Sequence, residues 1–295
     1  MFINPKTDFA FKKIFGSEQS KDILISFLNA MLYDGQDTIV DLQILDPYQA
    51  PRIQGIKDSF LDIKVQLHNK RTIIIEMQVL NVLGFDKRVL YNAAKAFSIQ
   101  LDAGESYTQL NPVVALTIAD FELFPGSSKV ISSYSLTEKD DKRRYSDDIE
   151  LVFVELPKFK KTLEELESLS DKWIYFLRYA NQLKEVPRSM ESEPALEHAF
   201  DVAQQTRLNR EELEILEQNQ RVIHDNQNAI LYAEQKALGE GIEQGIEQGL
   251  EQGRKQAMTE MAQQLFDILD LETIAQKTGL SLEELRSIKA SSIDS

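Results

Sequence analysis

The chain has 295 residues, of which 42% are hydrophobic, enough for one large core or for a core with an appendage. It contains no cysteine, which excludes disulfides and thiolate metal sites. Residues 1–160 carry 19 Lys and Arg against 22 Asp and Glu, a net charge of −3, whereas the remainder carries −12. This balance argues against general affinity for nucleic acid, but it leaves room for a local basic groove in the first half.

The sequence shows no pattern of a zinc site, a signal peptide or a membrane helix. The three histidines, His68, His198 and His224, lie far apart and lack zinc-ligand spacing. The N-terminal stretch MFINPKTDFAFKKIF lacks the apolar core of a signal peptide. No apolar run approaches the roughly 18 residues that a membrane helix needs. We therefore expect a cytoplasmic protein with no membrane partner.

The first half has the pattern of a mixed α/β fold. Apolar residues recur at helical spacing over residues 20–32. Strand-like runs are predicted at residues 38–45, 60–67, 72–80, 113–118 and 151–155. Between the third and fourth runs, a helical stripe from Val89 to Leu101 predicts a helix that ends near Gly104. A helix between two strands suggests a crossover within one sheet.

The second half is helical and charged. Residues 201–237 contain almost no Gly or Pro and predict a long helix. A four-residue repeat follows, GEGIEQGIEQGLEQGRKQ, with glycines at 241, 245, 249 and 253. On a helix this period forms a slowly drifting stripe, although each glycine weakens a helix by about 1 kcal/mol. Two interpretations stay open: a helix stabilised by a close-packed partner, and a flexible hinge.

The tail LFDILDLETIAQKTGLSLEELRSIKAS predicts two short helices around a tight turn. Asp270 and Ser281 are good N-caps, Glu284 completes a capping box with Ser281, and Gly279 fits the end of the first helix. The arrangement resembles a helix-turn-helix. However, Glu283 and Glu284 open the would-be recognition helix, where DNA phosphates would repel them. We therefore expect a packing or protein-contact module.

These patterns divide the chain into three parts: an α/β domain (1–187), a charged long-helix region (188–257) and a small helical tail (258–295). Apolar positions of the helical half need burial; they include Leu208, Leu213, Leu216, Ile223, Ile230, Leu231 and Leu238. The glycine stripe lets another backbone approach closely. We therefore expect a homo-oligomer, most simply a two-fold dimer, joined through this region.

The stretch LDIKVQLHNKRTIIIEMQV, residues 61–79, carries the candidate chemistry. Glu76 directly follows the apolar run 73–75, and a buried carboxylate costs several kcal/mol unless it is paired or bound to a metal. Period-two alternation places Glu76 and Gln78 on one face of their strand. Asp62 belongs to the preceding predicted strand, and the same alternation places it on the face opposite to the apolar residues of that strand.

The length of the turn decides whether Asp62 meets Glu76. A two-residue turn would pair Asp62 with Met77, whereas a three-residue turn would pair it with Glu76 (loop 68–70) or Gln78 (loop 69–71). Two carboxylates roughly 5–8 Å apart at Cβ can share a divalent cation. The alternative is a solvated hairpin whose polar face meets water. Because the spacing is short and degenerate, it favours the hairpin when taken alone.

Several segments of residues 1–125 carry a family resemblance: TDFAFKKIFG, ISFLNAML, LQILDP, KDSFLDIKV, IIIEMQV, KRVLYNAAKAFSIQL and GESYTQLNPVVALTI. Together with the acidic, repetitive C-terminal region, they resemble the Rpn family of recombination-promoting nucleases and transposases, within the PD-(D/E)xK nuclease superfamily. The resemblance implies a restriction-endonuclease-like α/β core, a mixed sheet flanked by helices. It also implies Mg²⁺- or Mn²⁺-dependent cleavage of DNA in bacterial recombination, mobile elements or defence.

The resemblance implies that Asp62 is the first metal carboxylate and Glu76 the second. Gln78 falls where the superfamily usually has lysine. Glutamine can hydrogen-bond a water molecule but cannot carry positive charge. Lys64, on the face of Asp62, and Lys57, just upstream, are candidates for the missing charge, and both also fit ordinary surface lysines.

Asp8, Lys12, Arg88 and Tyr91 match family-typical positions and are further site candidates. As alternatives, Asp8 caps the helix at residues 9–15, and Tyr91 belongs to the core. A rival function is a non-catalytic interaction protein, in which the helical half assembles oligomers on a degenerate nuclease-like platform. The acidic balance and the missing lysine favour this rival, whereas the intact pair of carboxylates favours the enzyme.

Overall fold

The computed structural model describes residues 1–49 and 59–293. The chain forms two compact units, Met1–Asp225 and Asn226–Ser295. The strands are β1 (Leu42–Leu45), β2 (Tyr48–Gln49), β3 (Ser59–Phe60), β4 (Ile63–Leu67), β5 (Thr72–Gln78), β6 (Val113–Ala119), β7 (Ile131–Thr137) and β8 (Arg144–Glu155). The α-helices are α1 (Asp8–Phe15), α2 (Lys21–Leu32), α3 (Phe85–Ser98), α4 (Leu169–Tyr179), α5 (Arg188–Glu191), α6 (Pro194–Val202), α7 (Arg210–Leu265), α8 (Leu271–Thr278) and α9 (Leu282–Ile293).

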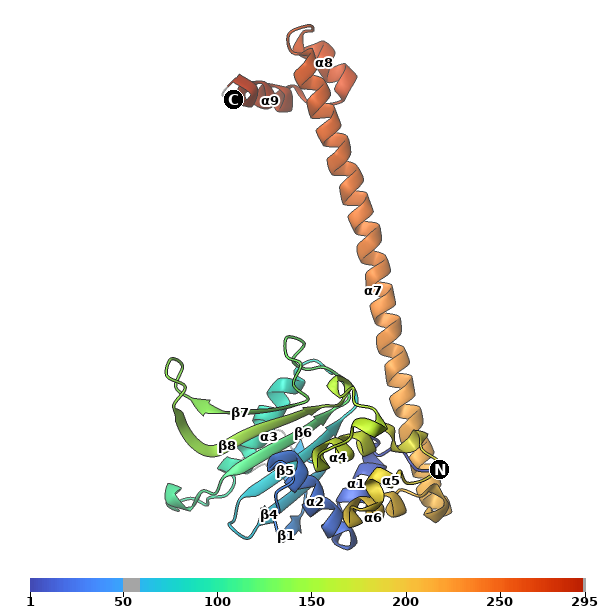
Figure 1. The fold of residues 1–295 in the computed structure, drawn as a ribbon. Coiled ribbons are helices and arrows are strands. Elements are labelled where there is room, and N and C mark those ends of the chain that lie inside the picture. Colours follow the sequence, from blue (N-terminus) through green and yellow to red (C-terminus); the bar gives the residue numbers. More distant parts are fainter. Residues whose placement is uncertain (50–58, 294–295) are drawn as a thin grey trace. The chain divides into compact units, whose positions relative to one another are not determined.

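The first unit is built on a mixed sheet. Within the described residues this sheet has six strands in the order β1-β4-β5-β6-β8-β7 (Figure 1). The central strand β6 is parallel to both β5 and β8, and the other pairs are antiparallel. Helix α3 connects β5 to β6, as the predicted crossover requires. The α/β class and the restriction-endonuclease-like arrangement of a mixed sheet flanked by helices are confirmed.

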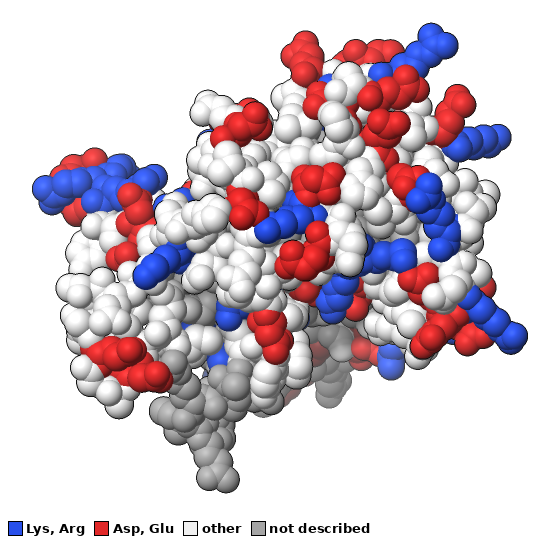
Figure 2. Space-filling view, turned by 90° about the horizontal axis from the view of Figure 1, so that it is seen from below, with Lys and Arg blue, Asp and Glu red and all other residues white. Residues whose placement is uncertain are grey.

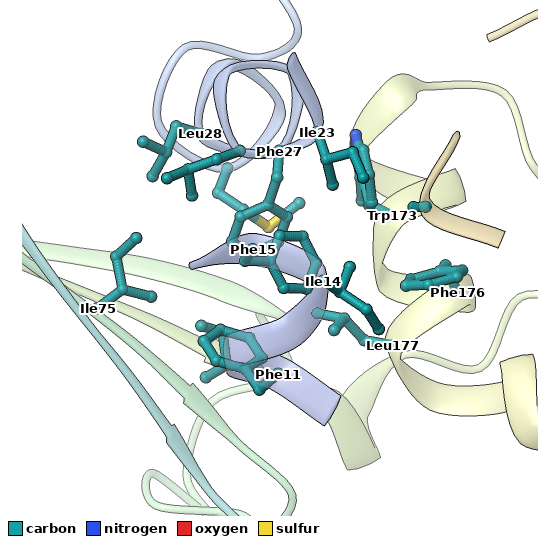
Figure 3. Close-up of a cluster of buried hydrophobic side chains, with 14 of the residues drawn as sticks. Phe11, Ile14, Phe15, Ile23, Phe27, Leu28, Ile75, Trp173, Phe176 and Leu177 are labelled. Carbon is teal, nitrogen blue, oxygen red and sulfur yellow. The ribbon is translucent and has the colours of Figure 1, made fainter. Parts of the chain in front are cut away.

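One face of the sheet packs against α1, α2, α4 and α6 around a large aromatic core. Ile73 and Ile75 of β5 are fully buried in it. Figure 3 shows Ile75 facing a cluster that includes Phe15 and Trp173. The ring centroid of Phe15 lies 4.8 Å from that of Phe27 and 5.8 Å from that of Trp173. This packing holds β5 on one side.

The opposite face of the sheet packs against α3. Ile74 of β5 is buried there with Phe85 and Val89 of α3 and with Phe153 of β8. The alternation of side chains therefore sends Ile74 toward α3 and its two neighbours toward the aromatic core. Glu76 follows on the α3 side, two residues after Ile74.

The β4–β5 hairpin has the three-residue loop that sets Asp62 opposite Glu76. The two strands pair in a register that runs from Gln66↔Thr72 to Ile63↔Ile75. The loop at residues 68–70 includes Lys70 with a φ of 64°, which fits the left-handed position of a three-residue hairpin. One further step along this register places Asp62 across from Glu76. Of the three turn alternatives, the structure has the loop 68–70.

Several predicted strand boundaries are wrong. The run 60–67 is interrupted at residues 61 and 62, so that β3 and β4 are separate, and the run 38–45 forms a strand only over β1. Strand β8 starts at Arg144, well before the predicted residue 151. The sequence gives no signal for β7, because its ISSYSLT pattern is mostly polar and the strand lies half-exposed at the sheet edge. Helix α3 ends at Ser98 rather than near Gly104.

The core of the first unit extends past the boundary expected at residue 187. Met190, Leu196 and Phe200 are fully buried in the aromatic core, and Leu208 and Leu216 are buried with them. The apolar faces of α5, α6 and the start of α7 therefore complete this unit. The long helix begins at Arg210 rather than at residue 201.

The second unit contains the rest of α7 with α8 and α9. The glycine repeat is helical throughout, so the helix rather than the hinge alternative is observed. A small core joins Ala262, Ile274, Leu280 and Leu285. The predicted caps are confirmed: Asp270 accepts the N–H of Thr273, Ser281 and Glu284 exchange both bonds of a capping box, and Gly279 ends α8 with a φ of 74°.

Charges of both signs are mixed on the surface. Figure 2 shows acidic and basic side chains interspersed across the viewed face. A nucleic acid on this face would therefore depend on local groups rather than on a broad basic surface. Among the described residues, no helix combines the length and the apolar character needed to cross a bilayer.

Candidate active site

A cavity of about 990 Å³ gathers most of the predicted site residues. Six of the candidates line it: Asp8, Asp62, Glu76, Gln78, Arg88 and Tyr91. They come from the first turn of α1, the connection between β3 and β4, the end of β5 and the first half of α3. Segments far apart in the sequence thus converge at one end of the sheet.

The Asp62 carboxylate takes the place of a backbone partner. The β4–β5 ladder stops at Ile63↔Ile75, and just beyond it Asp62 Oδ2 accepts the N–H of Met77 at 2.7 Å. Burial raises the pKa of Asp62 to about 6, and the negative charges of Asp8 and Glu76 add to this rise. The β4–β5 pairing therefore ends beside a carboxylate that is costly to ionise.

The Glu76 carboxylate is buried and only half satisfied. Asn92 Nδ2 donates to Glu76 Oε1 at 2.5 Å. Glu76 Oε2 has no hydrogen-bond donor among the described residues, and Arg88 Nη2 stays 3.8 Å away from it. Burial raises the pKa of Glu76, although Arg88 and Asn92 oppose this rise. The charge of Arg88 stabilises an ionised oxygen in this position, but the oxygen keeps an open acceptor site that a closer cation can occupy.

The two carboxylates fit a hard divalent cation. Carboxylate oxygens are the ligands that Mg²⁺ prefers, and the open Glu76 Oε2 is available as a donor. A cluster of three or more His, Asp or Glu side chains suited to a metal is absent from the described residues. Mg²⁺ does not require one, because it commonly binds through one or two carboxylates and completes its shell with water and substrate phosphate.

Gln78 is engaged at both ends of its side chain. Its Nε2 donates to the carbonyl oxygen of Leu80 at 2.7 Å, and its Oε1 accepts from Arg88 Nη2 at 2.6 Å. The guanidinium carbon of Arg88 also lies 5.0 Å from the centre of the Phe85 ring. Gln78 thus holds Arg88 in position at the rim of the cavity.

Lys12 of α1 is the lysine that reaches Asp62 within the described part of the chain. Its Nζ lies 2.6 Å from Asp8 Oδ1 and 3.9 Å from Asp62 Oδ1. Neither Lys12 nor Lys64 lines the cavity, but Lys64 is half-buried and makes no ion pair with Asp62; burial lowers its pKa, and Asp46 opposes the change. Lys57 lies outside the described residues. The geometry therefore favours Lys12 over Lys64 as the source of positive charge.

The alternatives for Asp8 and Tyr91 are not observed. The N-cap of α1 is Thr7, whose hydroxyl accepts the N–H of Ala10 at 3.3 Å, so Asp8 is free to pair with Lys12. Tyr91 is 40% exposed at the cavity rather than buried in the core.

The sequence interpretation missed Asn92. Its position four residues after Arg88 is a signal that could have found it, because residues four apart on a helix share a face. Phe60, Val82 and Leu83, which also line the cavity, were missed as well.

A family model described as PD-(D/E)XK nuclease family transposase matches residues 5–233. No curated protein and no solved structure matches the chain. The matched range includes the sheet, its covering helices and every described residue of the cavity. It supports a nuclease or transposase function, for which divalent metal ions are the general requirement.

Proposed function

The chain belongs to the PD-(D/E)XK nuclease family transposases, and we propose that it is a DNA endonuclease that hydrolyses phosphodiester bonds with Mg²⁺ or Mn²⁺. One observation carries the proposal. Asp62 and Glu76 line the same cavity, and the buried Glu76 Oε2 lacks a hydrogen-bond donor among the described residues. A buried, half-satisfied carboxylate beside a second one is unfavourable in a merely structural role and favourable in a metal site.

The chain's own groups hold the two metal-binding carboxylates in place. The Met77 N–H orients Asp62, and the Asn92 amide orients Glu76. When bound by these residues, a divalent cation lowers the pKa of a water ligand and stabilises negative charge on a phosphate. Because the donors to both carboxylates come from β5 and α3, the site rests on rigid elements rather than on a loop.

Two positively charged side chains, Lys12 and Arg88, have separate roles in this proposal. Lys12 stabilises the negative charge that develops on the attacked phosphate, because its Nζ lies beside Asp62. Arg88, held by Gln78 and by the Phe85 ring, binds a phosphate of the DNA backbone at the cavity rim. Gln78 is then a positioning residue for Arg88. It takes no proton and carries no charge.

The test of the activity uses the purified full-length chain and a supercoiled plasmid. We expect nicking or cutting with Mg²⁺ or Mn²⁺ and none with excess EDTA. Isothermal calorimetry with Mn²⁺ should show a binding site that is lost in Glu76→Ala. A folded protein that neither cuts DNA nor binds Mn²⁺ would reject the enzyme and leave the rival interpretation, a degenerate nuclease fold that serves as an interaction platform.

We also propose that the chain forms a homodimer through the second unit. Helix α7 has an exposed apolar stripe formed by Leu238, Ile242, Ile246 and Leu250. The space beside each nearby glycine is open, because no neighbouring group lies within 4 Å of the place that a Cβ would take. A second copy would cover this apolar stripe and put two active sites into one particle, which suits cleavage of both DNA strands.

Light scattering on the full chain and on Ile242→Gln/Ile246→Gln/Leu250→Gln tests the dimer. A parent monomer at micromolar concentration would exclude it, and a triple variant that keeps the parent's mass would exclude this surface. We further propose that the chain acts in the cytoplasm, in recombination, mobile-element movement or defence.

A further inference from the structure

The cavity of Asp62 and Glu76 has an apolar wall that the proposed chemistry does not use. Four apolar or aromatic residues line it: Phe60, Val82, Leu83 and Tyr91. Leu83 is fully exposed, Phe60 is 73% exposed, and Val82 and Tyr91 are 41% and 40% exposed. An exposed apolar surface inside a polar cavity marks a place where a ligand docks.

The wall is formed by a tight turn and by a supported ring. The connection from β5 to α3 reads VLNVLG, and it turns through a hydrogen bond from the Phe85 N–H to the Val82 carbonyl and through Gly84, whose φ is 79°. Turns of this kind normally carry polar residues, yet this one presents Val82 and Leu83. On the other side, the Phe60 ring packs against Tyr48 with ring centroids 4.9 Å apart.

Positively charged side chains lie between members of this wall along the same cavity. Lys87 and Arg88 line it four and five residues after Leu83, and Tyr91 follows one helical turn later. Cations that follow a phosphate backbone, interleaved with rings on which bases stack, form the characteristic surface of single-stranded nucleic-acid binding. The bases of a perfect duplex have no free face to pack against such a wall, because they are already stacked on one another.

We propose that this wall binds an unpaired nucleobase beside the scissile phosphate, so that the enzyme acts preferentially on DNA with unpaired nucleotides, such as single strands, bubbles and flaps. The proposal deepens the DNA cleavage proposed above and rests on it. The cavity, at about 990 Å³, has room for a nucleotide together with the carboxylate pair. Unpaired bases already lack the stacking and pairing that a duplex would have to lose on entering the cavity.

The experiment compares three labelled DNAs of the same sequence: a single strand, a duplex with a central bubble and a perfect duplex. Cleavage by the full-length protein is measured with Mn²⁺, and binding is measured separately by fluorescence anisotropy in EDTA. We expect the single strand and the bubble to be cut and bound at least about tenfold better than the duplex. Cleavage in the bubble should map to its unpaired positions.

Leu83→Ser and Tyr91→Ala should each lower the preference for unpaired DNA by about tenfold, in binding as well as in cleavage. Leu90→Ser is the matched control, because Leu90 is exposed on α3 next to Tyr91 but does not line the cavity. It should keep the parent's preference. The melting temperature of each variant is measured to confirm that it is folded.

The outcomes separate this inference from the proposed function. If all three DNAs are cut equally, and Leu83→Ser does not change this, the proposed nuclease activity stands, but the proposal that the wall binds an unpaired base is wrong. A preference for the perfect duplex that Leu83→Ser removes also overturns it, because Leu83 then acts as a wedge in a base step. No cleavage of any DNA, with preferential binding of unpaired DNA that depends on Leu83, supports the wall and rejects the nuclease.

Discussion

The two faces of β5 have opposite environments within a few residues. On one face, Ile73 and Ile75 are sealed in an aromatic core with no exposed surface. On the other face, Ile74 is buried against α3, and Glu76 then opens into the cavity. The aromatic core fixes β5 through Ile73 and Ile75. This packing holds the strand in place although its other face carries Glu76, a buried carboxylate that is only half satisfied.

The largest expected effect is loss of cleavage without loss of fold on the cavity side. Asp62→Ala and Glu76→Ala should each lower the rate of plasmid cleavage by at least about 1000-fold, because either change removes a ligand of the proposed metal site. Glu122→Ala, an exposed carboxylate outside the cavity, is the control and should cut like the parent. Parent-like cleavage by either cavity variant, with a normal circular dichroism spectrum, would contradict the site assignment.

For the face of β5 that packs in the aromatic core, we expect loss of stability without loss of metal binding. Ile75→Ala should lower the free energy of unfolding by about 2 to 5 kcal/mol, because it leaves a cavity in a fully packed aromatic core. Urea unfolding measures this loss, and Val40→Ala, at a largely exposed position, should change it little. Below its unfolding transition, the folded Ile75→Ala protein should still bind Mn²⁺. A stability equal to the parent's would mean that this face does not anchor the strand.

A smaller effect, about 100-fold in cleavage rate, is expected for Lys12→Ala, since it removes one stabilising charge from the reacting phosphate. The neighbouring Lys13 pairs with Glu212 instead, which makes Lys13→Ala the matched control. Gln78→Ala should cost less than Lys12→Ala, because Gln78 acts through Arg88. If Gln78→Ala is the more damaging variant, glutamine rather than Lys12 has taken over the role of the missing lysine.

The smallest effect is a gain in stability. Burial disfavours the ionised form of Asp62, so Asp62→Asn should stabilise the metal-free protein by about 1 to 3 kcal/mol at neutral pH while it abolishes cleavage. The asparagine oxygen can still accept the Met77 N–H. Thermal melts in EDTA and in Mn²⁺ measure the effect. We expect Mn²⁺ to stabilise the parent but not the variant, and a destabilised variant in EDTA would show that the carboxylate is not strained.

Local patterns in the sequence determined much of the fold. The alternation in residues 72–78 assigns Ile75 and Glu76 to opposite faces of a strand, because successive side chains always point to opposite sides. The caps Asp270, Ser281 and Gly279 were readable, since each satisfies its own helix end within a few residues. The family resemblance also named Asp62 and Glu76 as a pair, which residue spacing alone did not establish.

Only the tertiary structure decided how the cavity is assembled. The choice among three turn alternatives needed the register of β4 on β5, because each alternative was locally acceptable. Lys12 reaches Asp62 only because α1 packs on the sheet beside it, a contact between residues far apart in sequence. The resemblance places Gln78 where the superfamily usually has lysine, but in the structure Arg88 on α3 engages it. The alternation of a strand depends on its own backbone, whereas the groups that meet across a cavity depend on the packing of every element around it.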